Sequence, residues 1–287
     1  MGASPVLWLT IFFIVPLLYI FFLSFSEKEG IIGHQLTWSN AAYLRAFEPI
    51  YLEVLAKSFF IAACATVVCL LVGYPIALAI AFAPQRLKIP LLLAVTLPFW
   101  INIIVRTYSL IAVFRTRGFL NFSLEWFWDM GDKSLQLVGV ADGLGAAYAP
   151  LELLYTNTAV VFGIVYVFLP FMILPVYAAM ERFDRLYLEA ALDLGAGHWR
   201  TLFSVLLPLT LPGVASGVMI VFVPALGAFF IAEMLGGTDS QLIGNVIDRQ
   251  FKGANNWPFG SALSFLLMYL TFTCIVLRAY MLRRKTR

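Results

Sequence analysis

Charged residues are scarce in this sequence. Asp, Glu, Lys and Arg together make up 12% of its 287 residues, whereas a soluble globular domain carries about a quarter. Hydrophobic residues make up 62%. This composition argues against a water-soluble fold and predicts an all-α polytopic membrane protein.

The motifs of several enzyme classes are also missing. No Gly-Lys dipeptide occurs, so the chain has no Walker A phosphate loop. It has no Gly-x-Ser-x-Gly nucleophile motif either. The three cysteines (Cys64, Cys69, Cys274) and two histidines (His34, His198) are spaced too widely for a disulfide framework or a metal site. We therefore expect a protein that is no enzyme, binds no metal or cofactor itself and cannot hydrolyse ATP alone.

Six stretches hold no charged residue, and each is long enough to cross a bilayer, for which about 20 apolar residues suffice. They cover residues 2–26, 58–85, 89–105, 153–180, 201–232 and 253–277. The first lacks a basic start and a cleavage site, which favours a retained helix over a signal peptide. Six transmembrane helices are predicted, at about 5–25, 54–83, 90–114, 157–180, 212–235 and 259–282.

The placement of Lys and Arg sets the orientation, because these residues are retained on the cytoplasmic side. They cluster after the second and fourth helices and at the C-terminus, at Arg86, Lys88, Arg182, Arg185, Arg200, Arg283, Arg284, Lys285 and Arg287. Both termini are therefore expected inside. The outer loops are mildly acidic, which either attracts a cationic solute or simply reflects the retention of basic residues inside.

Two outer segments and one helix carry further patterns. Part of residues 115–155 is expected to form an interfacial helix with Trp126 and Trp128 at headgroup depth, followed by a Gly-rich loop at 139–145. Residues 236–258 are expected to form an outer loop that dips back into the protein. In the fifth helix, Gly213-Val-Ala-Ser-Gly217 has the spacing of small residues that lets two helices approach closely.

The cytoplasmic segment 181–208 has the pattern of a short amphipathic helix. Its apolar face consists of Phe183, Tyr187, Ala190, Ala191 and Leu194, and Arg185, Glu189 and Asp193 lie four apart on another face. Gly195 and Gly197 are expected to end the helix, and a second short helix is expected to run to Pro208. Amphipathicity alone is compatible with a helix lying on the membrane or with one that docks in the groove of a partner.

The spacing of particular residues in this segment favours docking on a partner. Glu-Ala-Ala, a Gly four residues later and a Leu-Pro pair near the end of the segment resemble the EAA loop of binding-protein-dependent ABC importer permeases, with Val205 in place of the usual Ile. In that family the loop seats in a cleft of a cytoplasmic ATPase. The resemblance implies that the ATPase-coupling residues are Glu189, Ala190, Ala191, Gly195, Leu207 and Pro208.

Other stretches resemble one branch of that family, the B-type permeases of spermidine/putrescine transporters. They are residues 97–108, 163–172, 235–246 and 256–262. The resemblance covers about 43–277 but fails at about 130–151, where the loop is longer. It implies a type I ABC importer transmembrane domain spanning 1–287 in the bacterial inner membrane. It also implies two ABC ATPase subunits that use ATP and Mg, a second homologous permease and an external polyamine-binding protein.

Two charges lie within the predicted helices, where charges by default suggest function. Arg106 either has an internal role or snorkels to the outer headgroups, and Glu233 either meets the substrate or faces water. The two could also form an ion pair. Nearby aromatic rings could accept an organic cation, so the candidate substrate path contains Trp100, Arg106, Tyr108, Tyr166 and Glu233, with Phe229 and Phe230 beside it.

The predicted function is that of a membrane permease in an ATP-driven polyamine importer. Import of another small solute is the alternative within the class. An ion-coupled secondary transporter is the alternative outside it, but such proteins usually carry several ionisable midplane groups and two related halves, and neither is visible here.

Overall fold

The computed structural model describes residues 7–30, 33–137, 148–184 and 186–285. The chain forms two compact units, one made of the residues up to Phe59 and those from Gln241, the other of Phe60–Ser240. Helix α4 (Pro49–Phe82) begins in the first unit and continues in the second. The predicted Gly-rich loop at 139–145 lies outside the described residues.

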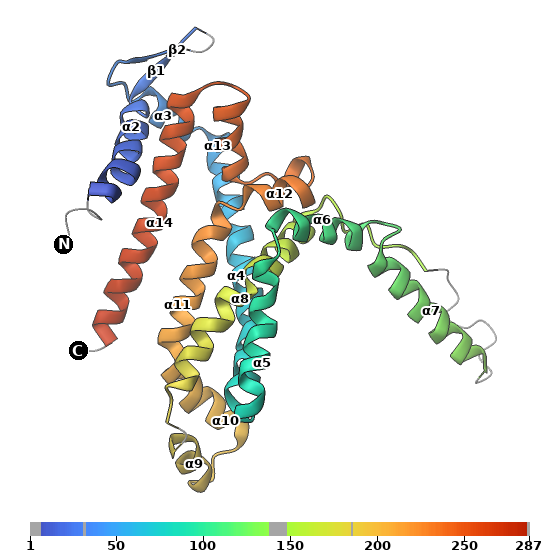
Figure 1. The fold of residues 1–287 in the computed structure, drawn as a ribbon. Helices are drawn as coiled ribbons and strands as arrows, with labels where there is room; N and C mark the ends of the chain where they lie inside the picture. Colours follow the sequence, from blue (N-terminus) through green and yellow to red (C-terminus); the bar gives the residue numbers. More distant parts are fainter. Residues whose placement is uncertain (1–6, 31–32, 138–147, 185, 286–287) are drawn as a thin grey trace. The chain divides into compact units, whose positions relative to one another are not determined.

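The first unit combines the two ends of the chain. Its remaining elements are the π-helix η1 (Thr10–Ile14), α2 (Val15–Leu23), β1 (Ser26–Glu29), β2 (Gly33–Leu36), α3 (Ala41–Ala46), α13 (Ile243–Lys252) and α14 (Trp257–Lys285) (Figure 1). Its core is a cluster of Ala46, Ile243, Phe259 and Leu263. Within it, the Ser58 hydroxyl accepts a hydrogen bond of 2.7 Å from the Ile243 amide.

A β-hairpin in this unit was not expected from the sequence. Strands β1 and β2 pair antiparallel, with Ser26 opposite Leu36. Gly30 at the turn has φ +63°, a left-handed conformation that glycine adopts without steric cost. The Lys28 ammonium donates a 2.7 Å hydrogen bond to the Ala254 carbonyl and so ties the hairpin to the segment before α14.

The second unit contains the remaining helices. They are α5 (Gln85–Thr96), the 3₁₀ helix η2 (Leu97–Trp100), α6 (Ile103–Phe114), α7 (Phe119–Leu137), α8 (Asn157–Glu181), α9 (Leu186–Asp193), α10 (His198–Thr201), the π-helix η3 (Leu202–Leu206), α11 (Leu207–Leu226), α12 (Phe229–Leu235) and the 3₁₀ helix η4 (Thr238–Ser240). Helix α8 matches the predicted fourth helix closely. It starts where the Thr156 hydroxyl accepts the Ala159 amide, a typical N-cap.

Helices α8 and α11 pack side by side at the centre of this unit (Figure 1). Small residues allow the contact: a Cβ on Gly213 would collide with Ala179, and one on Gly217 would lie 2.7 Å from the Met172 sulfur. Both glycines are buried. The predicted close approach at Gly213-x-x-x-Gly217 is therefore confirmed, and its partner is α8.

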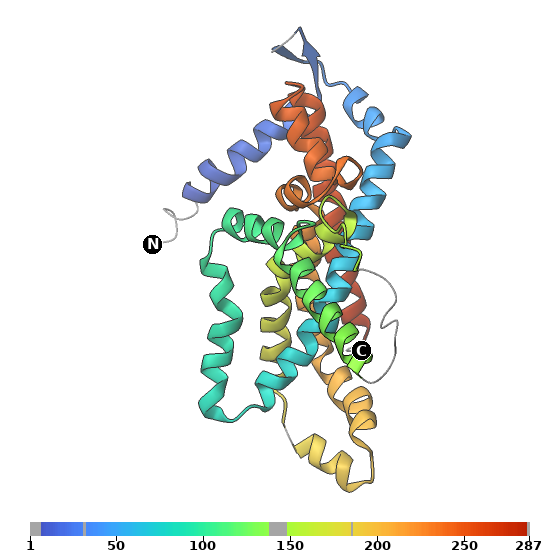
Figure 2. The same cartoon turned by 90° about the vertical axis from the view of Figure 1, so that its right-hand side faces the viewer.

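The predicted third helix, 90–114, is wrong as a single helix. Residues Gln85–Trp100 and Ile103–Lys133 meet at 94°, and Figure 2 shows α6 turning away from the top of α5. Ile101 is extended, and the Asn102 side chain accepts the Ile104 amide at 2.8 Å to start α6. An N-cap in mid-span supplies the backbone partner that a membrane helix loses at a break.

The predicted fifth helix also differs. Residues His198–Leu226 form one continuous helix, so no second short helix stops at Pro208, and the segment ends at Gly227 rather than Leu235. The π-helix η3 lies where the Pro208 ring would clash with the Ser204 carbonyl in a regular α-helix. Helix α12 is separate, so Glu233 does not lie about 30 Å along a straight helix, as the predicted helix 212–235 had implied.

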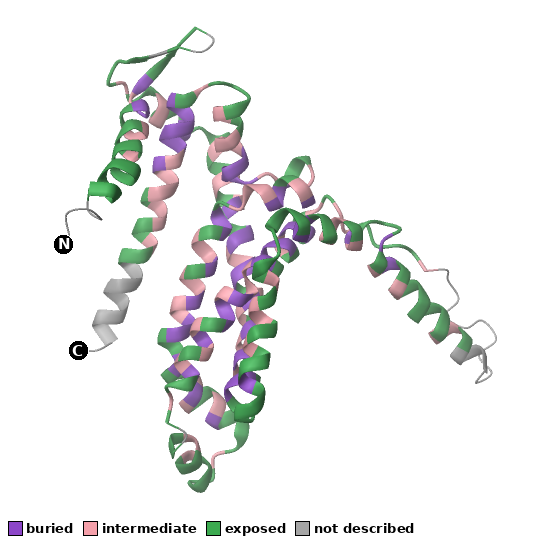
Figure 3. Ribbon diagram, viewed as in Figure 1, coloured by how far each residue is buried: buried purple, intermediate pink, exposed green. Residues whose placement is uncertain are grey.

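Each of the six predicted segments contains a helix among its described residues. Four helices are long and apolar enough to span a membrane, the bent pair gives a fifth span, and Leu7–Leu23 is a shorter apolar helix. Figure 3 shows many exposed residues along these helices. They include large apolar side chains such as Leu71, 68% exposed, which suits a surface that faces lipid.

Candidate functional site

The predicted coupling helix exists and lies beyond the end of the α8–α11 pair (Figure 1). Helix α9 starts at Leu186, so Phe183 precedes it, and Arg185 lies outside the described residues. The rings of Phe183 and Tyr187 still contact each other, with centroids 5.8 Å apart. Glu189 and Ala190 are exposed and Ala191 is half-buried, so the Glu-Ala-Ala triplet is available to a partner.

Gly195 ends α9 as the sequence predicts. Its φ is +81°, and its amide donates to the Leu192 carbonyl at 2.9 Å while the Ala196 amide donates to the Ala191 carbonyl at 3.0 Å. These two bonds form a Schellman motif, which favours glycine at the left-handed position. Gly197, in contrast, has φ −68° and is the N-cap of α10. Only the first of the two glycines is required by backbone geometry.

Large apolar side chains around this turn are exposed. Leu194 is 88% and Trp199 75% exposed, and Phe203 stacks on Trp199 with an interplanar angle of 18°. Exposed apolar groups at the polar end of a helical unit mark an interaction surface. The predicted apolar face is thus present, but Leu194 faces solvent rather than the rest of the unit.

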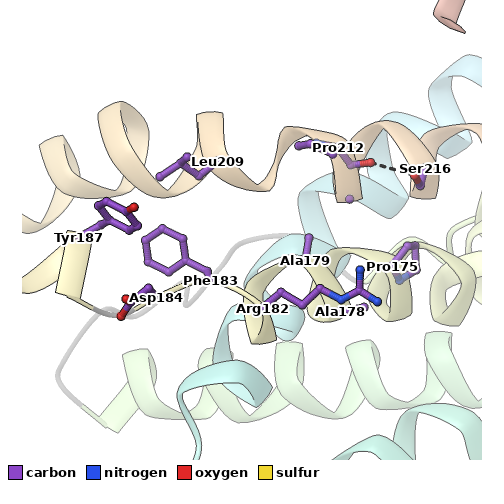
Figure 4. A pocket seen from close by; sticks show the side chains of 11 residues that line it. Pro175, Ala178, Ala179, Arg182, Phe183, Asp184, Tyr187, Leu209, Pro212 and Ser216 are labelled. Carbon is purple, nitrogen blue, oxygen red and sulfur yellow. Dashed lines mark hydrogen bonds between the residues drawn. The ribbon is translucent and has the colours of Figure 1, made fainter. Parts of the chain in front are cut away.

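A cleft of about 710 Å³ lies between α8, α9 and α11. In Figure 4 the Arg182 side chain runs back along α8 towards Ala178 and Pro175. The Asp184 carboxylate accepts the Leu186 amide at 3.0 Å and so caps α9. A second cavity, of about 460 Å³, separates Leu188 and Leu192 of α9 from the end of α4. Helix α9 is therefore bordered by open space, which leaves room for it to move.

An ion pair fixes the point from which this loop departs. Lys88, at the start of α5, places its Nζ 2.9 Å from both carboxylate oxygens of Glu181, the last residue of α8. The Lys88 side chain is 9% exposed and that of Glu181 42%. The sequence analysis did not predict this pair. A signal was present, because each residue lies next to a charge-free stretch, on the predicted cytoplasmic side.

The remaining predicted coupling residues lie at the base of α11. Pro208 is exposed and occupies the first turn, and Leu207 is half-buried. In the next turn the Thr210 hydroxyl contacts the Tyr74 hydroxyl of α4 at 3.1 Å. The Glu-Ala-Ala triplet and the Leu-Pro pair thus lie at opposite ends of one helix-turn-helix, joined by the Gly195 turn.

Arg106 of the candidate substrate path is 6% exposed. Its Nε and Nη1 have no hydrogen-bond partner among the described residues, and its guanidinium lies 5.8 Å from the centre of the Phe99 ring. A buried position does not suit a side chain that snorkels to headgroups. The geometry favours the internal role.

The other path candidates are accessible. Trp100 is 84% exposed, and Tyr108, Tyr166 and Glu233 are also exposed, whereas Phe229 and Phe230 are half-buried. Helices α6, α8 and α12, which carry four of the five residues, pack on one another. Within the described residues no ion pair joins Arg106 to Glu233.

Residues 73–286 match the family described as binding-protein-dependent transport system inner membrane component. The chain belongs to this family. The matched region contains α9, the Gly195 turn and the whole of α11. Membership accounts for the membrane-spanning helices and assigns the chain to transport rather than to enzymes.

Named relatives and a solved structure resemble most of this chain. The spermidine/putrescine transport system permease protein PotB of Escherichia coli (strain K12) is 37% identical over 260 residues, covering 91% of this chain and 88% of that protein. PotB of Haemophilus influenzae is 39% identical over 263 residues, covering 92% and 86%. The crystal structure of a bacterial ABC transporter that imports the acidic polysaccharide alginate superposes with a TM-score of 0.74 at 14% identity, covering 99% and 94%. This last match concerns the fold alone.

Proposed function

We propose that this permease is the membrane-spanning subunit of an ATP-driven importer that carries polyamines delivered by an external binding protein. The single observation behind the substrate class is the similarity of 37–39% over more than nine tenths of the chain to proteins named as spermidine/putrescine permeases. The alginate transporter shares the fold but takes an acidic polymer, so fold alone does not indicate substrate.

The helix-turn-helix from Glu181 to Pro208 supports docking on a separate ATPase. It offers an exposed short helix, a fixed glycine turn and exposed apolar side chains, which suits insertion into a partner's groove. Two ATPase subunits would use ATP and Mg, while this chain itself binds neither. A second, homologous permease and an external polyamine-binding protein complete the proposed importer.

The orientation is part of the proposal. The basic clusters at Arg86 and Lys88, around Arg182 and Arg200, and at the C-terminus place α9 and both termini in the cytoplasm. The hairpin β1–β2, α7 and α13 then lie on the outer side. A substrate would enter near Glu233 and leave at the side of α9.

The candidate substrate path consists of Trp100, Arg106, Tyr108, Tyr166 and Glu233. These residues lie on η2, α6, α8 and α12, and the chain breaks between η2 and α6. An exposed carboxylate with aromatic neighbours suits an organic ammonium group. We assign attraction of the substrate to Glu233 and the aromatic residues, and exclusion of small cations to Arg106.

The test is uptake of labelled spermidine by proteoliposomes that contain this chain, its genomic neighbour permease and ATPase, and the binding protein. Uptake should require internal ATP and loaded binding protein and should not respond to a proton or sodium gradient. Uptake driven by an ion gradient without ATP would support the secondary transporter instead. ATP-dependent uptake of another solute, with none of spermidine or putrescine, would retain the importer and overturn its substrate.

A further inference from the structure

Helix α7 (Phe119–Leu137) has two distinct surfaces. Phe119, Trp126, Phe127 and Met130 share one face, because Trp126 follows Phe119 by seven residues and Met130 follows Trp126 by four and Phe127 by three. The three aromatic residues are 73%, 52% and 63% exposed. Glu125, Asp129 and Asp132 share another face by the same rule. Figure 3 shows that exposed residues prevail along this helix.

The side of α7 opposite the aromatic face is held by the returning chain. The buried Asn121 amide donates to the Leu151 carbonyl at 2.9 Å, and its oxygen accepts the Leu151 amide and the Tyr148 hydroxyl, each at 2.8 Å. Further along, the Trp128 ring lies 6.3 Å from that of Tyr148. Trp128 is 37% exposed beside this contact, and the headgroup depth expected for Trp126 and Trp128 stays a prediction.

The junction with α6 is fixed as well. A Cβ on Gly118 would lie 2.6 Å from the carbonyl oxygens of both Ala112 and Val113, and the Gly118 amide bonds the Arg115 carbonyl at 2.7 Å. Only glycine fits this turn. Since both the turn and Asn121 constrain α7, its aromatic face has a defined direction relative to α6.

The bend before α6 places this face at membrane height. The span Gln85–Trp100 is about 24 Å long at 1.5 Å per residue, somewhat less than the roughly 30 Å hydrocarbon core. The segment Ile103–Lys133 then turns by 94°. If the span crosses the bilayer, α6 and the start of α7 run along the far boundary. On α6 the side chains of Val105 and Tyr108 are also exposed.

We propose that α7 is an interfacial anchor whose aromatic face, Phe119, Trp126, Phe127 and Met130, inserts between lipids at the outer surface of the bilayer. Amphipathic helices with aromatic residues on the apolar face bind at this depth. Glu125 and Asp129 on the acidic face are exposed and point to water. The three acidic residues are balanced by Arg115, Arg117 and Lys133, so the segment 115–133 has no net charge. The anchor therefore depends on apolar insertion and gains nothing from anionic lipid.

Spin-label accessibility tests this surface in the full importer, reconstituted in bilayers. Single cysteines replace Phe119, Phe127, Glu125 or Asp129 in a background without Cys64, Cys69 and Cys274, and only variants that retain substrate-stimulated ATP hydrolysis are measured. At the Phe119→Cys and Phe127→Cys positions, collisions with oxygen should exceed those with a water-soluble nickel chelate. At the Glu125→Cys and Asp129→Cys positions the order should reverse.

Two results would overturn the anchor. Equal access of the nickel chelate to all four positions would place the aromatic face in water, and protection of Phe119→Cys and Phe127→Cys from both reagents would place it against a protein partner. The same labels in phosphatidylcholine bilayers, with and without phosphatidylglycerol, should give the same depth. A depth that requires phosphatidylglycerol would overturn the apolar mechanism. None of these outcomes depends on which solute is imported.

Discussion

Lys88 and Glu181 join the start of α5 to the last residue before the coupling loop, with Nζ 2.9 Å from both carboxylate oxygens. The two partners differ in exposure, at 9% for the Lys88 side chain and 42% for that of Glu181. Water can solvate Glu181 when its partner is removed, but it cannot reach Lys88 as well. Removal of either partner should therefore have unequal effects.

The Glu181→Gln variant should lose about 2 kcal/mol of stability, the amount typical of hydrogen bonds to a charged group, because it leaves a buried ammonium unpaired. The Lys88→Met variant should lose less. Thermal unfolding of the purified complex in detergent measures both. Equal losses would contradict the asymmetry, and recovery by the Lys88→Glu/Glu181→Lys swap would confirm that the contact, rather than either side chain alone, is responsible.

Gly195 and Gly197 form a matched pair for testing the coupling turn. A Cβ at either position meets no atom within 4 Å, but only Gly195 has a positive φ. Gly195→Ala should strain the turn by about 1–2 kcal/mol and reduce ATPase stimulation by loaded binding protein, while Gly197→Ala should behave as wild type. Gly195→Pro should be more severe, since it also removes the amide that bonds Leu192.

For that pair the measurement is ATP hydrolysis by the reconstituted importer at equal amounts of inserted permease. Full stimulation in both Gly195 variants would exclude a role of the turn in docking. A loss in Gly197→Ala as large as that in Gly195→Ala would show that bulk at the turn, and not backbone conformation, is the sensitive property.

Glu233 and Arg106 give separable predictions because the described residues show no ion pair between them. Glu233→Gln should lower polyamine uptake by several-fold with normal expression, since an exposed carboxylate has no structural partner to lose. Arg106→Gln should keep uptake of polyamine but raise leakage of small cations through the resting importer. Uptake of labelled spermidine and a cation-sensitive dye, both normalised to inserted permease, distinguish these outcomes from a shared structural defect.

The orientation predicts which positions react from outside the cell. Single cysteines in place of Trp38 and Asn255, both exposed, should label with a membrane-impermeant thiol reagent, and one in place of the exposed His198 should label only after permeabilisation. The background lacks Cys64, Cys69 and Cys274. Labelling at position 198 in intact cells would reverse the topology and move the coupling loop away from any cytoplasmic ATPase.

Much of the fold could be predicted because a bilayer imposes a length and composition on each span. The positions of the helix breaks could not be predicted. Pro170 and Pro175 lie inside the continuous helix α8, and Pro75 lies inside α4, so proline alone does not identify a break in a membrane helix. The break after η2 depends on the Asn102 cap and the extended Ile101, and such local hydrogen bonding does not alter hydropathy.

The coupling loop was the most predictable part of the site because its features are local in sequence. The Gly195 turn depends on amides within four residues of it. In contrast, the Lys88–Glu181 pair joins residues 93 apart, and the burial of Arg106 depends on how α6 packs against other helices. The contact between the Trp128 and Tyr148 rings joins residues 20 apart through the returning chain, and no sequence pattern predicted it.

The hydrogen bond from the Ile243 amide to Ser58 has a consequence for biogenesis. The two residues are 185 apart in sequence, and ribosomes add about 5–20 residues per second. The Ile243 amide that donates to the buried Ser58 hydroxyl is therefore synthesised on the order of 10–40 s after Ser58. By then all residues from Phe60 to Ser240 have been synthesised. During that interval the first helices are inserted without their C-terminal neighbours, which makes them natural clients for an insertase or a membrane chaperone.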